Sequence, residues 1–368
     1  MRTSHVLLLA LGLAACGQEK VYKIGVVTRS SASDGAELAA REANGKEGVN
    51  GVALRVQRAD TVATVHPDTA QVVEKLVADT AVKFVLALPG AGLSPTIVQV
   101  LERHPVPVLV LGPALGQLGG KWFFYLMPSV AQEAQLMATQ AQKLWQPKRV
   151  VIVRAPNTYG SELAAALRKQ VPTGSTLVLD TTFVETQDTV VVAILERTVR
   201  AANPDVLFWL GPPRVLGTLV ARLRDHLPEL RIMGSDAVEG KRIYDNEDGR
   251  FSGLVFVRAA DPNVDTARYN SFQYRFSMWQ GGQGTSEALL AYDASSMVVQ
   301  GMRAGALSRA QIRDYLASLG KTRPAFTGVT GPIAFDSTGV LQRPLGLAEV
   351  RDDGVKPVPL ATSPVSER

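Results

Sequence analysis

A regular alternation of short strands and longer helices is the feature that most limits how this chain can fold. From Tyr22 onward, short runs rich in β-branched residues alternate with longer segments whose apolar residues recur at helical spacing. This alternation is typical of a parallel sheet whose strands are connected by helices that cover its faces. We therefore predict an α/β fold with doubly wound parallel sheets.

The alternation occurs in two series, each of which predicts one lobe. In the first series, strands are expected at 23–28, 53–59, 82–88 and 108–111, with helices at 35–44, 68–79 and 94–103. The second series begins after Met127-Pro128 with a helix at 130–145 and has further helices at 159–169, 190–202 and 214–226. Its strands are expected at 149–154, 176–183, 206–210, 231–233 and 253–258.

The pattern changes after Arg258. Three helical segments are expected at 266–280, 286–306 and 308–319, followed by short strands at 333–335 and 347–351. These elements are too few to build a third domain, so we expect them to complete the first two lobes.

The N-terminus has the layout of an export signal. Arg2 precedes an apolar run of about eight residues, less than half of the roughly 20 that a membrane-spanning helix needs. The segment Leu13-Ala14-Ala15-Cys16 resembles the bacterial lipobox, which implies that residues 1–15 are removed as a lipoprotein signal peptide and that Cys16 is acylated. An ordinary signal peptide followed by an incidental cysteine is the alternative.

The cysteine count favours acylation. Cys16 is the only cysteine among 368 residues, so an exported chain cannot form an internal disulfide and would otherwise carry a free thiol. We therefore predict a protein of the periplasm or cell surface that is anchored to a membrane through acylated Cys16. Because Gly17 and not Asp follows the cysteine, the known inner-membrane retention signal is absent and the choice of membrane stays open.

Motifs for catalysis, cofactors and nucleic acid are missing from the sequence. The basic residues behind the net charge of +5 are scattered and form no stripe interleaved with aromatic residues, which argues against a nucleic-acid partner. Four histidines, no His-Glu-x-x-His and no Gly-x-Ser-x-Gly argue against a metal site and a catalytic triad. Gly90-Ala91-Gly92 resembles the start of a dinucleotide fingerprint, but Pro95 occupies the third glycine position. We expect no enzyme, no metal and no cofactor.

A series of short motifs occurs along the chain in a characteristic order. They are Lys23-Ile24-Gly25-Val26-Val27 before Gly35-Ala36-Glu37-Leu38-Ala39 and Asn44, Val106-Pro107-Val108 before Gly112-Pro113-Ala114, Asn157-Thr158-Tyr159-Gly160, Met233-Gly234-Ser235-Asp236, Ala291-Tyr292-Asp293-Ala294, and Phe326-Thr327-Gly328-Val329-Thr330-Gly331 before Phe335-Asp336 and Gly339. Together they resemble the type I periplasmic binding proteins, in the branch that binds leucine, isoleucine, valine and related amino acids or amides for ABC transporters.

The resemblance implies two doubly wound parallel-sheet lobes joined by a hinge of three crossings. The first lobe would contain residues 22–128 and 262–331, the second 129–258 and 332–361, and residues 362–368 would form a tail. The crossings are expected near 127–129, 258–262 and 331–335. Closure of the lobes around a ligand would exclude water and strengthen hydrogen bonds to its polar groups.

The resemblance also implies ligand contacts. Ser94 and the loop that precedes it would hold an α-carboxylate, and the loop with Gly112, Pro113 and Leu115 would add a backbone contact. Tyr159 would pack on the ligand, Asp236 would receive its α-ammonium group, and Tyr292 would lie at the pocket edge. Structural roles are the alternatives: Ser94 and Asp236 also suit helix caps, Tyr159 would cover its own helix start, and Tyr292 would belong to the core.

The chain also departs from the family pattern. The loop at 29–34 is shorter than usual, Leu115 and Gly116 replace a small hydroxyl-bearing pair, and Pro212 replaces an aromatic residue. These changes remove polar anchors, so the ligand would be less polar than a free amino acid or bind more weakly.

The sequence thus predicts a solute-binding lipoprotein that captures a small amino-acid-like ligand for an ABC importer through its permease. A ligand-sensing or regulatory lipoprotein of the same fold without a transporter is the alternative.

Overall fold

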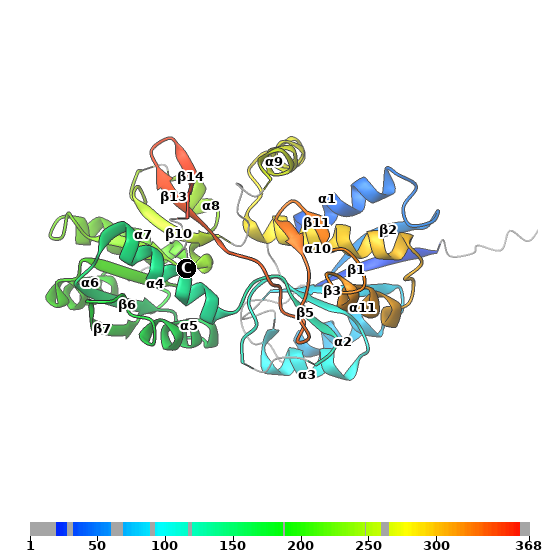
Figure 1. Cartoon of the computed structure of the whole chain (residues 1–368), viewed down its shortest axis with the longest axis horizontal. Coiled ribbons are helices and arrows are strands. Elements are labelled where there is room, and N and C mark those ends of the chain that lie inside the picture. The colour runs from blue at the N-terminus through cyan, green and yellow to red at the C-terminus, as the bar shows by residue number, and fades with distance from the viewer. Residues whose placement is uncertain are drawn as a thin grey trace, which may run out of the picture.

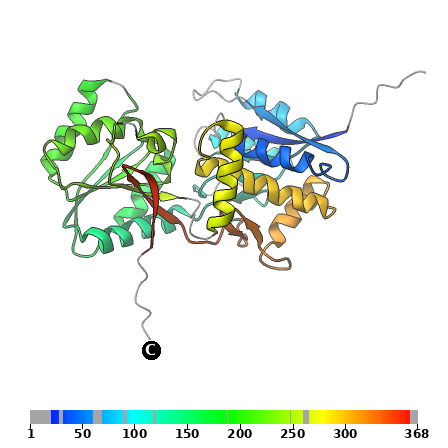
Figure 2. The same cartoon turned by 90° about the horizontal axis from the view of Figure 1, so that it is seen from above.

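The computed structural model of the chain describes residues 20–27, 32–59, 69–88, 93–116, 120–186, 188–246, 248–258 and 265–360. The predicted signal peptide 1–15, Cys16 and the tail 362–368 lie outside these residues. Two sheets, one parallel and one parallel except for its last two strands, form the centres of two lobes that lie side by side along the long axis of the molecule (Figures 1 and 2). The two-lobed α/β architecture predicted from the sequence is confirmed.

The first lobe is built on a five-stranded parallel sheet of strand order β2-β1-β3-β4-β5. Its strands are β1 (Val21–Val27), β2 (Ala53–Ala59), β3 (Val82–Ala87), β4 (Val108–Val110) and β5 (Phe123–Tyr125). Its helices are α1 (Ala32–Asn44), α2 (Thr69–Ala78), α3 (Pro95–Arg103), α9 (Thr266–Gln280), α10 (Ser286–Arg303) and α11 (Arg309–Ser318). The last three helices therefore return to the first lobe after the chain has built most of the second (Figure 1).

Alternation along the strands divides the core of the first lobe into two layers. Ile24 and Phe84 are fully buried in a layer shared with α1, α10 and α11, whereas Val85 and Val108 are buried in a layer shared with α2 and α3. Because successive side chains of a strand point to opposite faces, a sheet covered on both faces needs apolar residues at nearly every position. Burying one such side chain contributes about 1.5–3 kcal/mol.

The second lobe is built on a seven-stranded sheet of order β14-β13-β10-β9-β8-β6-β7. The five strands β6 (Arg149–Arg154), β7 (Thr176–Thr182), β8 (Val206–Leu210), β9 (Arg231–Gly234) and β10 (Leu254–Arg258) are parallel. The last two, β13 (Gly346–Arg351) and β14 (Gly354–Val358), form an antiparallel hairpin that extends the sheet beside β10.

Helices cover both faces of the second sheet. On one face, α4 (Val130–Trp145) and α5 (Thr158–Arg168) pack on Ile152 and Phe208, and on the other α6 (Thr189–Ala202) and α7 (Pro213–Arg224) pack on Val153 and Trp209. A 3₁₀ turn, η2 (Asp236–Val238), and the short helix α8 (Lys241–Asp245) follow β9. The sequence prediction missed α8, β5, β14 and β11 (Phe326–Gly328). It placed a strand at 333–335, whereas the structure has β12 at Gly331–Ile333, paired with β11 in a small hairpin.

The chain passes between the lobes three times. The first passage lies between β5 and α4, and the second follows β10 and leads to α9. The third lies later than the predicted position near 331–335, because Val340 still forms a bridge with Tyr125 and the Leu341 amide donates to the Tyr125 carbonyl at 3.0 Å. Only after Leu341 does the chain run across to β13 (Figure 1). The other domain boundaries remain predictions.

Candidate ligand-binding site

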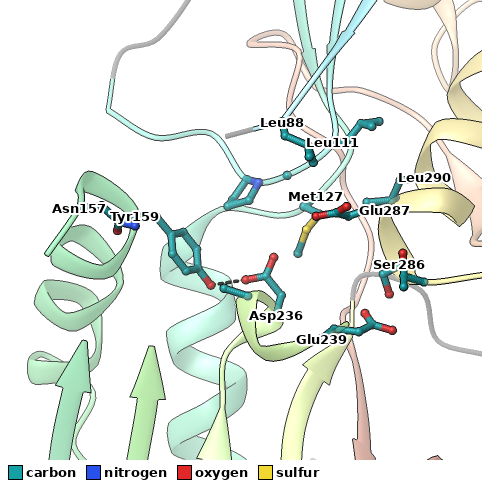
Figure 3. A pocket seen from close by; sticks show the side chains of 14 residues that line it. Leu88, Leu111, Met127, Asn157, Tyr159, Asp236, Glu239, Ser286, Glu287 and Leu290 are labelled. Atoms are coloured by element: carbon teal, nitrogen blue, oxygen red, sulfur yellow. Dashed lines mark hydrogen bonds between the residues drawn. The ribbon is translucent and has the colours of Figure 1, made fainter. Parts of the chain in front are cut away.

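A cavity of about 210 Å³ lies between the two lobes (Figure 3). The first lobe contributes Leu88, Leu111, Gly112, Pro113, Met127, Thr285, Ser286, Glu287 and Leu290. The second lobe contributes Asn157, Tyr159, Asp236, Ala237 and Glu239.

Strand ends bring most of these residues together. Leu88 follows β3 and Leu111 follows β4, while Asn157 and Asp236 lie in the connections that leave β6 and β9. Ligands of open α/β sheets bind outside the carboxyl ends of the strands, because the connecting loops diverge there. The two sheets therefore present their carboxyl ends to one shared cavity.

Tyr159 is positioned by the start of α5. Asn157 is the N-cap of this helix, and its side-chain oxygen accepts a hydrogen bond of 2.8 Å from the Gly160 amide. This cap fixes the first turn of α5, and the Tyr159 ring points toward Asp236 in η2, the turn that follows β9 (Figure 3). Its hydroxyl group contacts a carboxylate oxygen of Asp236 (Figure 3).

A second carboxyl group, that of Glu133, lies behind this contact. The Tyr159 hydroxyl is 3.0 Å from both Glu133 oxygens, and the Asp236 amide donates to Glu133 at 3.0 Å. One phenol proton cannot serve acceptors on both acids at once. A second proton held on the carboxyl pair resolves this shortage of donors.

The electrostatics of the three groups favour that proton. Burial, followed by the nearby negative charge of Asp236, raises the pKa of Glu133 well above its ordinary value. Burial also raises the pKa of Asp236, although hydrogen bonds from Tyr159 and Glu133 oppose the increase. Burial raises the pKa of the Tyr159 hydroxyl well above its usual value. We therefore assign the extra proton to Glu133 and the negative charge to Asp236.

Glu239 belongs to a buried cluster at the second passage between the lobes. Its carboxylate pairs with Arg258 at 3.1 Å and accepts a hydrogen bond from the Tyr244 hydroxyl. Arg258 also donates to Tyr244 at 2.9 Å and to Tyr269 of α9 at 3.3 Å. This cluster therefore connects the end of β10 in the second lobe with α9 in the first.

The loop after β4 contacts the second lobe directly. The Gly116 amide, in the left-handed region at φ 58°, donates to the Glu162 carboxylate of α5 at 3.1 Å. Leu115, predicted to contact the ligand, is buried in the core and does not line the cavity among the described residues. A loop held at both lobes supports the cavity wall that Gly112 and Pro113 form.

The structure places four of the seven predicted ligand contacts at the cavity. Gly112, Pro113, Tyr159 and Asp236 line it. Ser94 instead caps α3, with its hydroxyl oxygen accepting from the Ile97 amide at 3.4 Å. Residues 89–92 of the predicted carboxylate loop lie outside the described residues, so the role of Ser94 toward a ligand remains a prediction.

Tyr292 lies away from this cavity. Its hydroxyl donates to Glu42 at 2.7 Å and accepts from Arg275 at 3.1 Å, which joins α10 to α1 and α9. The neighbouring Asp293 explains the motif around Gly328: its carboxylate accepts from the Val329 and Thr330 amides at 2.8 and 2.7 Å. These motif residues stabilise the first lobe.

The sequence alone did not identify three residues that line the cavity, Ser286, Glu287 and Glu239, or Glu133, which contacts two lining residues. Glu133 reads as a first-turn acid of α4, and Ser286 and Glu287 read as the first turn of α10. Of these four residues, Glu239 had the clearest signal in the sequence, since it follows the Gly234-Ser235-Asp236 motif by three residues. Only the tertiary arrangement brings these side chains to the lobe interface.

The described lining residues carry acidic groups and no basic ones. Asp236, Glu239 and Glu287 line the cavity, while no Lys, Arg or His of the described part of the chain does. The described residues contain no cluster of three or more His, Cys, Asp or Glu with the arrangement of a metal site. None of the described helices combines the length and hydropathy needed to cross a bilayer.

The sequence family of periplasmic binding proteins matches residues 25–355. The chain belongs to this family. This periplasmic binding protein is 22% identical over 317 residues to the Leu/Ile/Val-binding protein homolog 3 of Brucella melitensis, which is 84% of this chain and 83% of the relative. The family predicted from the motifs is thus confirmed.

Solved structures share the fold of this periplasmic binding protein. The branched-chain amino acid transporter substrate binding protein LivJ of Streptococcus pneumoniae, in complex with isoleucine, is 21% identical with a TM-score of 0.80, over 92% of this chain and 99% of that one. A solute binding protein of an ABC transporter from R. palustris, in complex with benzoate, is 14% identical with a TM-score of 0.78, over 92% and 96% of the two chains.

Proposed function

We propose that this periplasmic binding protein is an extracytoplasmic, lipid-anchored solute-binding protein that captures a small amino-acid-like ligand for an ABC importer and catalyses no reaction. The observation that carries the proposal is the cavity between the lobes, whose described ionisable lining residues are all acids. A ligand held there touches both lobes, so its binding energy favours the closed arrangement.

The proposed contacts follow from the charge of the site. Asp236 receives the ligand ammonium group, and a charge-assisted hydrogen bond to a carboxylate is roughly twice as strong as a neutral one. The ligand carboxylate faces the loop after β4, where the Gly112 amide can donate and Pro113 cannot. Leu88, Leu111, Met127 and Leu290 provide the apolar wall.

The size of the cavity supports a small solute. Its volume of about 210 Å³ is below the range of roughly 300–1,000 Å³ that is usual for pockets holding drug-sized ligands. Relatives of known ligand support the same class, since the S. pneumoniae protein was solved with isoleucine and a Desulfitobacterium hafniense protein with leucine.

A thermal-shift screen of the purified protein tests the ligand class. Amino acids, amides, short acids and aromatic acids are added one at a time, and a ligand that binds only the folded state raises the melting temperature. We expect a shift with at least one amine-bearing acid and none with the matching desamino acids. A shift caused only by acids that lack an amine would contradict the proposed ligand class.

Membrane anchoring is tested by labelling cells with a radioactive fatty acid. The wild-type chain should incorporate label and fractionate with membranes, whereas Cys16→Ala should lose both properties. Uptake of the ligand found in the screen should fall when the gene is deleted, and unchanged uptake would favour a sensor without a transporter.

A further inference from the structure

Two buried polar atoms at the cavity have no hydrogen-bond partner among the described residues. They are the hydroxyl oxygen of Ser286, a residue 7% exposed, and one carboxylate oxygen of Glu239, whose side chain is 4% exposed. Both residues line the cavity between the lobes. Buried polar groups of native proteins nearly always have a partner, so two orphans at one cavity need an explanation.

The two residues come from opposite lobes. Ser286 is the first residue of α10 in the first lobe, and Glu239 follows η2 in the second. Figure 3 shows them on the same side of the cavity, with Tyr159 on the opposite side. A ligand group placed between them would therefore bind both lobes at a point away from the Tyr159–Asp236 contact.

The partners of Glu239 determine what that group can be. Arg258 balances its charge at 3.1 Å, and Arg258 and Tyr244 hold the carboxylate in a fixed orientation. The remaining oxygen is a hydrogen-bond acceptor with no need for a full positive charge opposite it. A serine hydroxyl both donates and accepts, so a ligand group with two N–H bonds can donate one to each residue, and a ligand hydroxyl can accept from Ser286 while donating to Glu239.

We propose that Ser286 and Glu239 form a second polar subsite, which binds a hydrogen-bond donor at the end of the ligand side chain. The ligand class is then an amino acid whose aliphatic stem packs on the apolar wall and ends in an N–H donor, in place of a purely aliphatic branched-chain amino acid. This inference rests on the proposed function and names the substrate class of the same cavity.

Isosteric ligand pairs test the subsite on the wild-type protein. Asparagine and leucine have side chains of similar shape, and glutamine and norleucine have side chains of similar length. Calorimetry measures the affinity of the protein for each of the four amino acids. A site built to hydrogen-bond a ligand discriminates strongly against an analogue that lacks the polar group, so we expect the amide to bind about tenfold more tightly or better. Ornithine added as a third ligand shows whether the donor is an amine.

A variant pair tests the residues. Ser286→Ala should remove most of the preference for the amide, weakening asparagine binding far more than leucine binding. Ser295→Ala is the matched control, because Ser295 lies in the same helix and is fully buried with an unpartnered hydroxyl, yet does not line the cavity. We expect that control to bind both ligands as the wild type does.

Each outcome separates the subsite from the proposed function. Leucine binding as tightly as or more tightly than asparagine, glutamine and ornithine overturns the subsite and leaves the proposed function standing. Equal weakening of leucine and asparagine by Ser286→Ala also overturns it. Absence of binding by every amino acid removes the proposed function and the subsite together.

Discussion

Arg258 and Glu239 form an ion pair of 3.1 Å in which both side chains are almost completely screened from water, at 3% and 4% exposure. Burial alone would lower the pKa of Arg258, but the Glu239 carboxylate and the hydroxyls of Tyr244 and Tyr269 raise it above its ordinary value. Arg258 therefore stays charged, and the position of the pair between β10 and α9 makes it part of the connection between the lobes.

Breaking this pair should destabilise the protein strongly. Arg258→Met leaves Glu239 buried without its cation, and removing one partner of a buried pair costs about 3–5 kcal/mol. Urea unfolding measures the loss. Arg268→Met is the control, since Arg268 pairs with Asp265 while 53% exposed, and exposed pairs are worth about 0–1 kcal/mol. Equal losses of unfolding free energy in the two variants would show that the buried Arg258–Glu239 pair stabilises the protein no more than an exposed pair does.

Asp236 should carry the affinity for the ligand amine. Asp236→Ala removes the carboxylate that faces the cavity, and hydrogen bonds to charged groups are worth about 1.5–3 kcal/mol, so affinity should fall about 10- to 150-fold. The thermal shift produced by an amine-bearing ligand should then disappear. Asp225→Ala, at an exposed carboxylate of the same lobe, should leave the shift unchanged. An unchanged shift in Asp236→Ala would remove Asp236 from the site.

The proton on Glu133 should make stability depend on pH. The pKa of Glu133 is raised in the folded state, so above about pH 4.5 the folded protein still holds a proton that the unfolded chain has released. The stabilisation that this proton provides is complete below about pH 4.5 and is lost as the pH rises through the folded pKa. The free energy of unfolding should fall across this window by about 1.4 kcal/mol per pH unit for this proton.

Glu133→Gln should remove that slope, because glutamine is neutral at every pH. Chemical unfolding at several pH values above 4.5 compares it with the wild type and with Glu102→Gln, an exposed control that should keep the wild-type slope. If Glu133→Gln shows the wild-type slope, the proton does not reside on the Glu133–Asp236 pair.

The fold was largely predictable because its strands are buried on both faces. Strands β6 and β8 have the predicted boundaries, since residues 150–153 and 206–210 are apolar throughout. The three-residue strand β5 and the hairpin strand β14 were missed. Their pairing depends on β4 and β13, so short local sequence could not reveal them.

The site was predictable where it follows a strand and unpredictable where it depends on packing. The family resemblance implied Tyr159 and Asp236, and both follow strands, β6 and β9, whose carboxyl ends face the cavity, as is usual for ligand sites of parallel sheets. Glu133 sits in a helix whose N-terminus independently favours an acid, so its local sequence gave no sign of a second role. Its contact with the Asp236 amide spans 103 residues of sequence.

The packing of α1 on α10 requires Gly35. A Cβ atom at this position would lie 2.0 Å from the Ala288 carbonyl oxygen, so Gly35→Ala forces the two helices apart and should cost about 1–3 kcal/mol. Gly45→Ala is the matched control just beyond the same helix, where the nearest atom would be 3.5 Å away. Thermal unfolding compares the two variants, and a Gly35→Ala variant as stable as Gly45→Ala would contradict the observed helix contact.

The hydrogen bond between the Gly116 amide and Glu162 should slow ligand release, because it joins the loop beside the cavity in one lobe to α5 in the other. Glu162→Ala removes the acceptor, and a hydrogen bond exposed to solvent, worth about 0.5–1.5 kcal/mol, corresponds to a dissociation rate roughly two- to tenfold faster. Stopped-flow measurement should show this change with little effect on the association rate, since encounter occurs before the lobes close. Glu162→Gln retains an acceptor oxygen and should release ligand nearly as slowly as the wild type. Equal dissociation rates for the wild type and Glu162→Ala would mean that this contact persists when the ligand leaves, so the lobes would have to open about a different part of the interface.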